Sequence, residues 1–370
     1  MKQISRLSTS LNNYFGWNKA RMSCFTKMLI SLFAVKTVNL SEIAVGFIGK
    51  AQKESNYRRA QRFFLEHEID MDKLAIFLFF MFFNKNKQVY LTIDRTNWYW
   101  GKSKINILTL GIAYEGVAIP ILWELLEKAG NASGDEHKSI VERFVKIFGK
   151  DLIAGILADR EFANKDFFEW LTKNEVPFFI RVKEGAKVQF FREKKFKLEK
   201  IFKSLDLKKQ MSCIQPVIIH GQKLFVSAGR SENGELLIVA TNQQNANAVS
   251  AYLRRWEIES LFQCLKSRGF RFEETHVTDL KKISKIMALL SIGFCWAHKV
   301  GEWRDRKRPI RFKKFLKSRR PQYSYFRYGL DWIREIILHI YCRAKQFDQC
   351  LQQLIFPDKS MIDSLLEGTI

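Results

Sequence analysis

Three strand patterns in a row, between residues 88 and 122, restrict the fold more than any other feature of the chain. Apolar and polar residues alternate along Gln88–Asp94, which predicts a β-strand. Two further strand-like runs follow at Asn106–Tyr114 and Val117–Leu122. The step Glu115-Gly116 between these two runs predicts a tight hairpin turn. We therefore expect the core to begin with three antiparallel strands.

The next sixty residues, up to Val182, alternate helix and strand patterns. A helical pattern at Glu136–Phe148 precedes Leu152–Ala158, a continuous apolar run that is typical of a strand buried on both faces. A second helical pattern at Lys165–Lys173 and another strand at Phe178–Val182 complete the series. Three antiparallel-type strands followed by helix, strand, helix and strand is the order of an RNase H-like α/β core. The predicted fold class is therefore α/β, with an RNase H-like mixed sheet.

The regions around this core differ in character. From Glu184 to about Asn242 the sequence is basic and carries short strand-like runs at Cys213–His220, Lys223–Ala228 and Leu236–Ala240. We interpret this stretch, at about residues 185–242, as a β-rich insertion. The predicted division is a helical region at residues 1–85, the core with its insertion at 86–270, and a basic helical region at 271–370.

The charge of the chain identifies a class of partner. The 370 residues include 62 Lys and Arg against 38 Asp and Glu, which gives a net charge of +24. Hydrophobic residues make up 47% of the chain, which is too many for a disordered polycation. A positive globular protein attracts polyanions. Nucleic acid is therefore the leading partner class, with an anionic membrane surface as the competitor.

Basic side chains concentrate at both ends of the chain. Asn39 or Ser41 can cap a helix that is followed, after a glycine-containing break, by a second helix with Arg58, Arg59 and Arg62. This pair of helices suits DNA contact, or else it is a solvated face of a small bundle. Near the C-terminus, Arg304–Arg320 holds ten Lys and Arg in seventeen residues, with aromatic residues between them. We interpret that run as a contact for the DNA backbone, with a solvated tail as the alternative.

The longest apolar runs and the cysteines indicate neither a membrane span nor a Cys-x-x-Cys site. Leu74–Phe83 and Ile286–Ala297 are both shorter than the roughly 20 apolar residues that cross a bilayer, so we expect buried helices and no membrane partner. No secretory signal pattern precedes them. The six cysteines are scattered, with no Cys-x-x-Cys pair. This spacing favours free thiols in a reducing, cytoplasmic setting.

Three acidic residues stand where a catalytic site is expected. Asp94 and Asp159 each follow a predicted strand, and these two strands are neighbours in an RNase H-like sheet. A predicted helix from about residue 247 to 266 supplies the third. At 100° per residue, Tyr252, Arg255, Glu259 and Lys266 form one polar stripe on that helix, opposite its apolar face.

The spacing of this stripe resembles a known family. Tyr252-x2-Arg255-x3-Glu259-x6-Lys266 is similar to the Y-R-E-K signature of bacterial DDE transposases of the insertion-sequence-four type. Asp94-Arg95-Thr96-Asn97-Trp98, Ala158-Asp159-Arg160-Glu161-Phe162 and Gly130-Asn131-Ala132-Ser133 also resemble that family. The resemblance covers roughly residues 35–330, including the order of the parts.

The resemblance implies an enzyme and assigns roles within it. Asp94, Asp159 and Glu259 would be the catalytic residues and would hold two Mg²⁺ ions, for which Mn²⁺ can substitute. Tyr252, Arg255 and Lys266 would bind phosphates of the DNA. The chain would cleave the ends of a mobile element and join them to a target. Glu161, Asp135, Glu136 and Asp166 are better explained as helix caps or first-turn acids.

The resemblance also implies partners and a location. The substrates would be double-stranded DNA, as inverted-repeat ends and as target, and bringing two ends together would need at least a homodimer. The region 1–85 would bind DNA, and the protein would work in the bacterial cytoplasm at the nucleoid. Two alternatives stay open: a structure-specific nuclease or resolvase on the same core, and a repurposed DNA-binding protein without catalysis.

Overall fold

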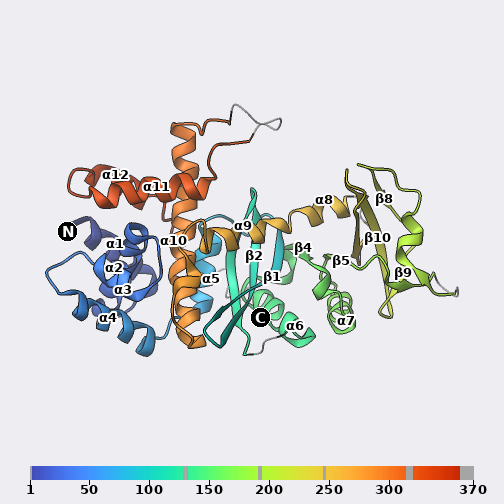
Figure 1. The fold of residues 1–370 in the computed structure, drawn as a ribbon, viewed down its shortest axis with the longest axis horizontal. Coiled ribbons are helices and arrows are strands. Elements are labelled where there is room, and N and C mark those ends of the chain that lie inside the picture. The colour runs from blue at the N-terminus through green and yellow to red at the C-terminus, as the bar shows by residue number, and fades with distance from the viewer. Residues whose placement is uncertain are drawn as a thin grey trace. The chain divides into compact units, whose positions relative to one another are not determined.

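The computed structural model describes residues 2–127, 130, 132–190, 194–244, 247–313 and 320–358, and its elements are labelled in Figure 1. The chain forms two compact units. Unit 1 contains the described residues of Met1–Phe83, Trp98–Ile105 and Phe262–Ile362, and unit 2 those of Asn84–Asn97 and Asn106–Leu261. The division into residues 1–85, 86–270 and 271–370 concerns the functions of the parts and stays a prediction.

Unit 2 is built on a mixed sheet. Among the described residues the sheet has nine strands, with the order β3-β2-β1-β4-β5-β11-β10-β8 and with β9 paired to β10. Strands β1, β4 and β5 run parallel, whereas β2 and β3 form an antiparallel hairpin. This order and these directions confirm the RNase H-like mixed-sheet core. The core strands are β1 Val89–Trp100, β2 Ser103–Tyr114, β3 Val117–Leu125, β4 Ile153–Ala158 and β5 Phe178–Val182.

The insertion extends the core sheet and does not form a sheet apart from it. Strand β11 pairs antiparallel with β5, and β10 pairs with β11, β8 and β9. Among the described strands, only β6 and β7 pair outside this sheet. The strands are β6 Lys187–Val188, β7 Phe196–Lys197, β8 Gln210–Ser212, β9 Val217–Ile219, β10 Gln222–Arg230 and β11 Leu236–Thr241, and a 3₁₀ helix spans Leu198–Phe202. The sequence pattern did not indicate β8.

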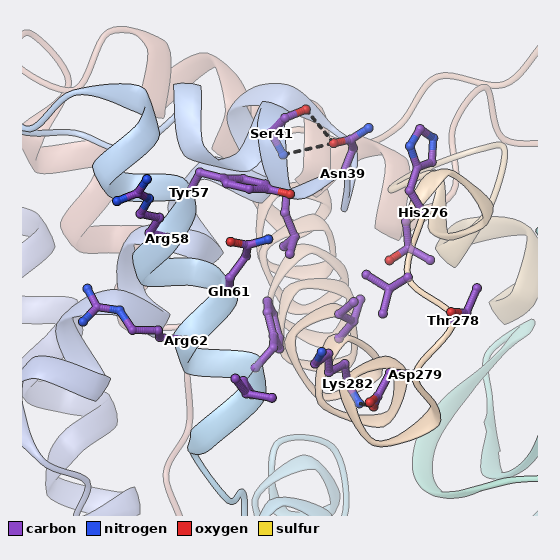
Figure 2. Close-up of a pocket in the computed structure, with 16 residues that line it drawn as sticks. Asn39, Ser41, Tyr57, Arg58, Gln61, Arg62, His276, Thr278, Asp279 and Lys282 are labelled. Atoms are coloured by element: carbon purple, nitrogen blue, oxygen red, sulfur yellow. Dashed lines mark hydrogen bonds between the residues drawn. The ribbon is translucent and has the colours of Figure 1, made fainter.

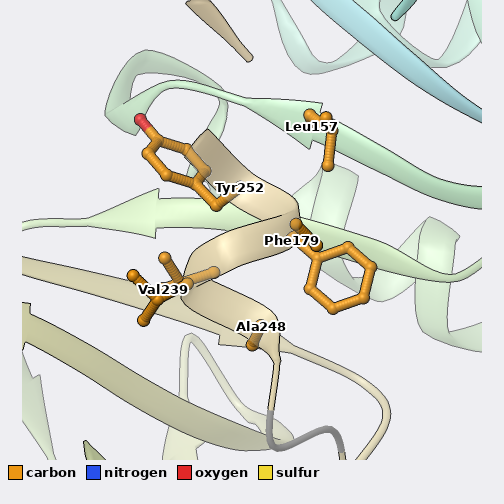
Figure 3. Close-up of a cluster of buried hydrophobic side chains, with 7 residues drawn as sticks. Leu157, Phe179, Val239, Ala248 and Tyr252 are labelled. Atoms are coloured by element: carbon orange, nitrogen blue, oxygen red, sulfur yellow. The ribbon is translucent and has the colours of Figure 1, made fainter. Parts of the chain in front are cut away.

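Helices cover both faces of this sheet. Successive residues of a strand point to opposite faces. Phe178 of β5 stacks on Phe168 of α7 with a ring distance of 5.3 Å, while Phe179 packs in a buried cluster with Ala248 and Tyr252 of α8 (Figure 3). Helices α7 and α8 therefore lie on opposite faces. The helices of this unit are α6 Gly134–Phe148, α7 Lys165–Lys173 and α8 Ala248–Leu253, with α9 Trp256–Leu265 crossing the boundary between the units.

Local signals in the core are confirmed. Glu115 and Gly116 join β2 to β3 with φ angles of 44° and 89°, as a tight hairpin turn requires. Ser133 and Glu136 form a reciprocal capping box at the start of α6. Glu136 is thus a cap, as its sequence position predicts. Asn131, in the predicted family segment before α6, lies outside the described residues.

Unit 1 is helical and is built around α10. The elements are α1 Lys2–Phe15, α2 Lys19–Val35, α3 Leu40–Val45, α4 Lys53–Glu66, α5 Met71–Phe80, α10 Leu280–Lys307, α11 Tyr325–Leu338 and α12 Ala344–Leu351. Helix α10 has 28 residues and is apolar enough to cross a membrane by length and composition, yet 89% of its most apolar window is buried inside the protein. Helix α5 likewise buries Leu74 and the five residues that follow it. The two apolar runs of the sequence therefore lie in buried helices, as predicted.

Helices α10 and α11 approach so closely that glycine is required at their contact. A Cβ at Gly301 would lie 1.9 Å from the carbonyl oxygen of Tyr325, and one at Gly329 would lie 1.8 Å from that of Ala297. Beside this contact, the buried carboxylate of Glu302 pairs with His298 at 3.3 Å and with Lys299 at 2.9 Å. Burial raises the pKa of Glu302, but its interactions with His298 and Lys299 outweigh burial and lower it to about 2.

The basic run near the C-terminus is only partly described. Helix α10 ends at Lys307, and residues 314–319 lie outside the described part of the chain. Arg304, the first residue of the run, stacks on the rings of Tyr328 and Trp332 at 4.3 Å and 3.9 Å. This arginine therefore contributes to packing between α10 and α11. The proposed DNA contact of the run stays a prediction.

Candidate active site

The register of two parallel strands brings Asp94 and Asp159 to neighbouring positions. Ile93 of β1 pairs with Ala158 of β4, and each carboxylate belongs to the residue that follows this pair. Asp159 comes after the end of β4, as predicted. Asp94 does not end its strand, however, because β1 continues to Trp100. The expectation of a strand end at Asp94 is wrong, although its place beside Asp159 follows from the same sheet.

The predicted continuous helix over residues 247–266 is broken in the structure. Helix α8 ends at Leu253 and α9 begins at Trp256, with a tighter turn between them. The backbone N–H of Arg255 donates to the carbonyl of Tyr252, and that of Ile258 donates to the carbonyl of Arg255. These are bonds to the third preceding residue, which overwind the helix locally. The break places Arg255 on the inner side of the segment.

Arg255 joins the two halves of the acidic site. Its Nη1 lies 3.2 Å from Oδ2 of Asp94, and its Nη2 lies 2.7 Å from Oε1 of Glu259. Its Nε donates to the hydroxyl of Tyr252 at 3.2 Å, and its own carbonyl accepts from Thr92 of β1. The guanidinium side chain is only 5% exposed. One buried cation thus holds together a carboxylate from the sheet and one from the helix.

Burial and neighbouring acids perturb Asp94. Burial is the main cause that raises the pKa of Asp94 to about 6. The charges of Glu161 and Glu259 raise this pKa further, while the backbone N–H of Arg95 and the guanidinium of Arg255 lower it. Burial and neighbouring negative charges disfavour the ionised form of a carboxylate, so a nearby cation stabilises that form strongly. Such perturbation is typical of functional sites.

Tyr252 and Arg255 are buried, although the sequence places both on the polar stripe opposite the apolar face of the helix. Tyr252 is 2% exposed and packs against Leu157, Phe179 and Val239 (Figure 3). Burial raises the pKa of its hydroxyl, which accepts the bond from Arg255 Nε. The hydroxyl therefore positions Arg255 in this structure. A contact of Tyr252 with DNA phosphate stays a prediction.

Lys266 belongs to the other compact unit. Its ammonium group pairs with Glu273 at 2.8 Å and lies 5.2 Å from the ring centre of Trp98. The contact of Lys266 with DNA stays a prediction.

The site also contains an ion pair that the sequence analysis missed. Glu161 accepts two hydrogen bonds of 2.8 Å from Arg95, and its charge reaches Asp94. Glu161 was expected to be a helix cap or a first-turn acid, and it does lie in the first turn of the 3₁₀ helix Arg160–Phe162, whose N-cap is Asp159. One sequence feature could have indicated this ion pair. Asp-Arg follows both strand patterns, as Asp94-Arg95 and as Asp159-Arg160, and the pairing of these strands places Arg95 opposite the acids after β4.

The carboxylate oxygens of the site suit a divalent cation, although in this structure Arg255 holds the carboxylates in place. Carboxylate oxygens from three elements are the ligands that Mg²⁺ and Mn²⁺ prefer. Within the described residues, no three acidic, imidazole or thiol groups are grouped as a metal site would require. The guanidinium of Arg255 instead lies between Asp94 and Glu259, where it supplies the positive charge that both carboxylates need.

Together, the fold and the site define a class of protein that has an RNase H-like α/β core, two neighbouring aspartates and a glutamate on a helix. A family model described as "Transposase DDE domain" matches residues 87–295, more than half of the chain. The chain belongs to this transposase family. No curated protein sequence matched it.

One solved structure that the chain is similar to is titled "Cryo-EM structure of piggyBac transposase synaptic complex with hairpin DNA (SNHP)". The two share 11% sequence identity with a TM-score of 0.46, and the match covers 93% of this chain and 77% of that chain.

Proposed function

We propose that this transposase is of the insertion-sequence-four type and moves DNA by cut-and-paste, using Asp94, Asp159 and Glu259 as its catalytic acids. The observation that carries the proposal is the bridge from Arg255 to Asp94 and Glu259, beside the register neighbour Asp159. Tyr252, Arg255 and Glu259 of the Y-R-E-K spacing form one hydrogen-bonded chain. Residues three or four apart on a helix meet in any case, so the contact that supports the proposal is the one from Arg255 to Asp94, 161 positions away.

The three acids would hold two Mg²⁺ ions, with Mn²⁺ as a substitute. Bound ions supply charge neutralisation at the scissile phosphate and lower the pKa of the attacking water. Arg255 holds Asp94 and Glu259 at the site before metal binding. Because it carries five donors in a planar fork, the same guanidinium can turn to a DNA phosphate once the carboxylates have another cation. Lys266 and Tyr252 would add phosphate contacts.

The substrates would be double-stranded DNA, as element ends and as target. The net charge of +24 supports binding to a polyanion, and the basic helices within residues 1–85 support a DNA-binding role for that region. Two ends must be cut and joined together, so we propose a homodimer in the DNA complex. The cytoplasm at the bacterial nucleoid is the proposed location, and the six cysteines are free thiols in accordance with a reducing setting.

The decisive experiment is a cleavage and joining assay. Purified protein is incubated with Mg²⁺ and with linear DNA that carries the inverted repeats flanking its gene. We expect cuts at the repeat ends, followed by joined products with a second DNA. Cleavage without joining would instead support the nuclease, and binding without cleavage would support the non-catalytic DNA-binding protein.

Single variants then test the assignment of the acids. Glu259→Gln should abolish cleavage and leave binding to the ends largely intact, because it removes a metal ligand but no positive charge. Glu257→Gln is the matched control, since this residue lies on the same helix but pairs with Arg254. The assignment is wrong if Glu259→Gln still cuts at a rate close to that of the parent protein.

A further inference from the structure

A groove lies in unit 1, between helix α4 and the segment that leads into α10 (Figure 2). Its volume is about 870 Å³. Tyr57, Gln61 and Leu65 of α4 line one wall, and residues 275–279 with Lys282 line the other. All of these residues belong to the same compact unit. Helix α3, the glycine-containing turn after it and α4 form the helix pair that the sequence predicts.

Helix α4 presents two different rows of side chains at this groove. Tyr57 and Gln61, one turn apart, extend toward the segment that carries His276, whereas Arg58 and Arg62 lie along the other edge of the helix (Figure 2). Gln61, Arg58 and Arg62 are all exposed. The result is an uncharged polar row in the groove beside a row of positive charge.

The opposite wall is held in place by a ring contact. His276 has a left-handed backbone with φ of 56°, and its ring stacks on that of Trp100 at 3.9 Å with 16° between the planes. This contact fixes a residue that would otherwise avoid such a conformation. The contact therefore holds the wall that carries His276 in place.

The groove carries positive charge that the protein does not neutralise. Among the described residues, no acid lies within ion-pair distance of Arg58, Arg62 or Lys282. The acid that lines the groove is Asp279, and its carboxylate caps α10 by accepting from the N–H of Lys282. Arg62 also lines a smaller neighbouring cavity of about 390 Å³ that contains Arg59 and the ion pair of Arg21 with Glu66. Arg58, Arg59 and Arg62 thus form a row of cations along α4.

The two side-chain amides in the groove differ in what they offer a ligand. The Asn39 carbonyl accepts from the backbone N–H and the hydroxyl of Ser41, so it caps α3. The Gln61 amide makes no hydrogen bond within the described part of the chain and is exposed in the groove. A free amide offers one donor and one acceptor side by side, which matches the major-groove edge of adenine.

We propose that α4 reads the sequence of the element end, with Gln61 bonding the major-groove edge of an A·T pair while Arg58 and Arg62 hold the flanking phosphates. Lys282 adds a phosphate contact from the opposite wall. The proposal rests on the proposed function for the identity of the DNA, but it concerns recognition only. It assigns the sequence preference to one amide and the affinity to the three cations.

The test is a binding experiment with the full-length chain in EDTA, so that no cleavage is needed. The probe is a library of random-sequence DNA duplexes, from which bound molecules are selected and sequenced. The parent protein should select a motif containing at least one strongly preferred A·T pair. Gln61→Ala should lose the preference at one such position by about tenfold or more and keep the rest of the motif. Gln349→Ala, an exposed helical glutamine of the same unit, is the control and should keep the full motif.

The cations are tested by the salt dependence of affinity for one selected duplex. Arg58→Ala and Arg62→Ala should each weaken binding to all sequences alike and lower the slope of log affinity against log salt by about one. Lys282→Ala should do the same, whereas Lys281→Ala, its exposed neighbour outside the groove, should change the slope less. Far-ultraviolet circular dichroism confirms that each variant is folded.

The outcomes separate this proposal from the proposed function. An unchanged motif in Gln61→Ala, or the absence of any A·T preference in the parent protein, would overturn the recognition proposal even if Mg²⁺-dependent cleavage is observed. Loss of one A·T preference in a protein that never cleaves DNA would sustain the recognition proposal and refute the catalytic one.

Discussion

The bridge made by Arg255 predicts a stability change that depends on metal. Replacing it in Arg255→Met keeps much of the side-chain length but removes three polar contacts, to Asp94, Glu259 and Tyr252. Two carboxylates then lie close together without the cation between them. Removing one partner of a buried ion pair costs about 3–5 kcal/mol. We expect the lower end, about 3 kcal/mol, because the Glu259 side chain is 34% exposed.

The assay is equilibrium unfolding by urea at pH 8, once in EDTA and once in saturating Mg²⁺. In EDTA the variant should lose about 3 kcal/mol of unfolding free energy relative to the parent. An ion that binds the folded state at a hundred times its dissociation constant adds about 2.7 kcal/mol. This gain should be larger in the variant, because its carboxylates have lost their competing guanidinium. Arg268→Met, at an exposed position, is the control and should change stability by no more than about 0.5 kcal/mol.

A double variant isolates the cause. Adding Asp94→Asn to Arg255→Met removes one of the two unpaired charges, so part of the lost stability in EDTA should return. The reasoning is refuted if Arg255→Met is as stable as the parent in EDTA. It is equally refuted if Mg²⁺ stabilises the parent and the variant by the same amount.

Three further predictions concern stability at other sites. The pKa of Glu302 is lowered to about 2, so its charge stabilises the fold above pH 4.5 and this contribution is lost as the pH falls toward 2. Glu302→Gln should therefore cost about 3 kcal/mol at pH 7 and clearly less at pH 3, and an equal cost at both pH values in urea unfolding would contradict the ion pairing. Gly329→Ala should destabilise the protein by about 1–3 kcal/mol, because the new Cβ meets the carbonyl of Ala297; at an ordinary helical site this change stabilises, so a raised melting temperature would disprove the close approach. Tyr252→Phe should cost about 1 kcal/mol through the lost bond to Arg255, whereas Tyr252→Ala should cost about 3–5 kcal/mol, and similar losses for both in calorimetry would argue against the buried ring.

Part of the site was determined by the sequence alone. The strand patterns at β1 and β4 and the order of the elements place these two strands side by side. Once they pair in parallel, Asp94 and Asp159 become neighbours, because register follows from which residues are apolar. The capping box at Ser133 is equally local. These features depend on residues close in sequence, which is why the pattern was sufficient.

Tertiary packing decided the rest. A helical wheel assumes a straight helix, and it placed Tyr252 and Arg255 on a polar stripe opposite the apolar face. Packing of α8 on the sheet buries the Tyr252 ring, and the tighter turn after it directs Arg255 inward. The pairing of Glu161 with Arg95 joins residues 66 positions apart, and no local rule relates them. Sequence thus determined which charged groups the chain carries at its core. Only the three-dimensional arrangement decided which cation pairs with each acid. A buried charge is destabilising unless it is paired, and the tertiary fold determines which partner lies within reach.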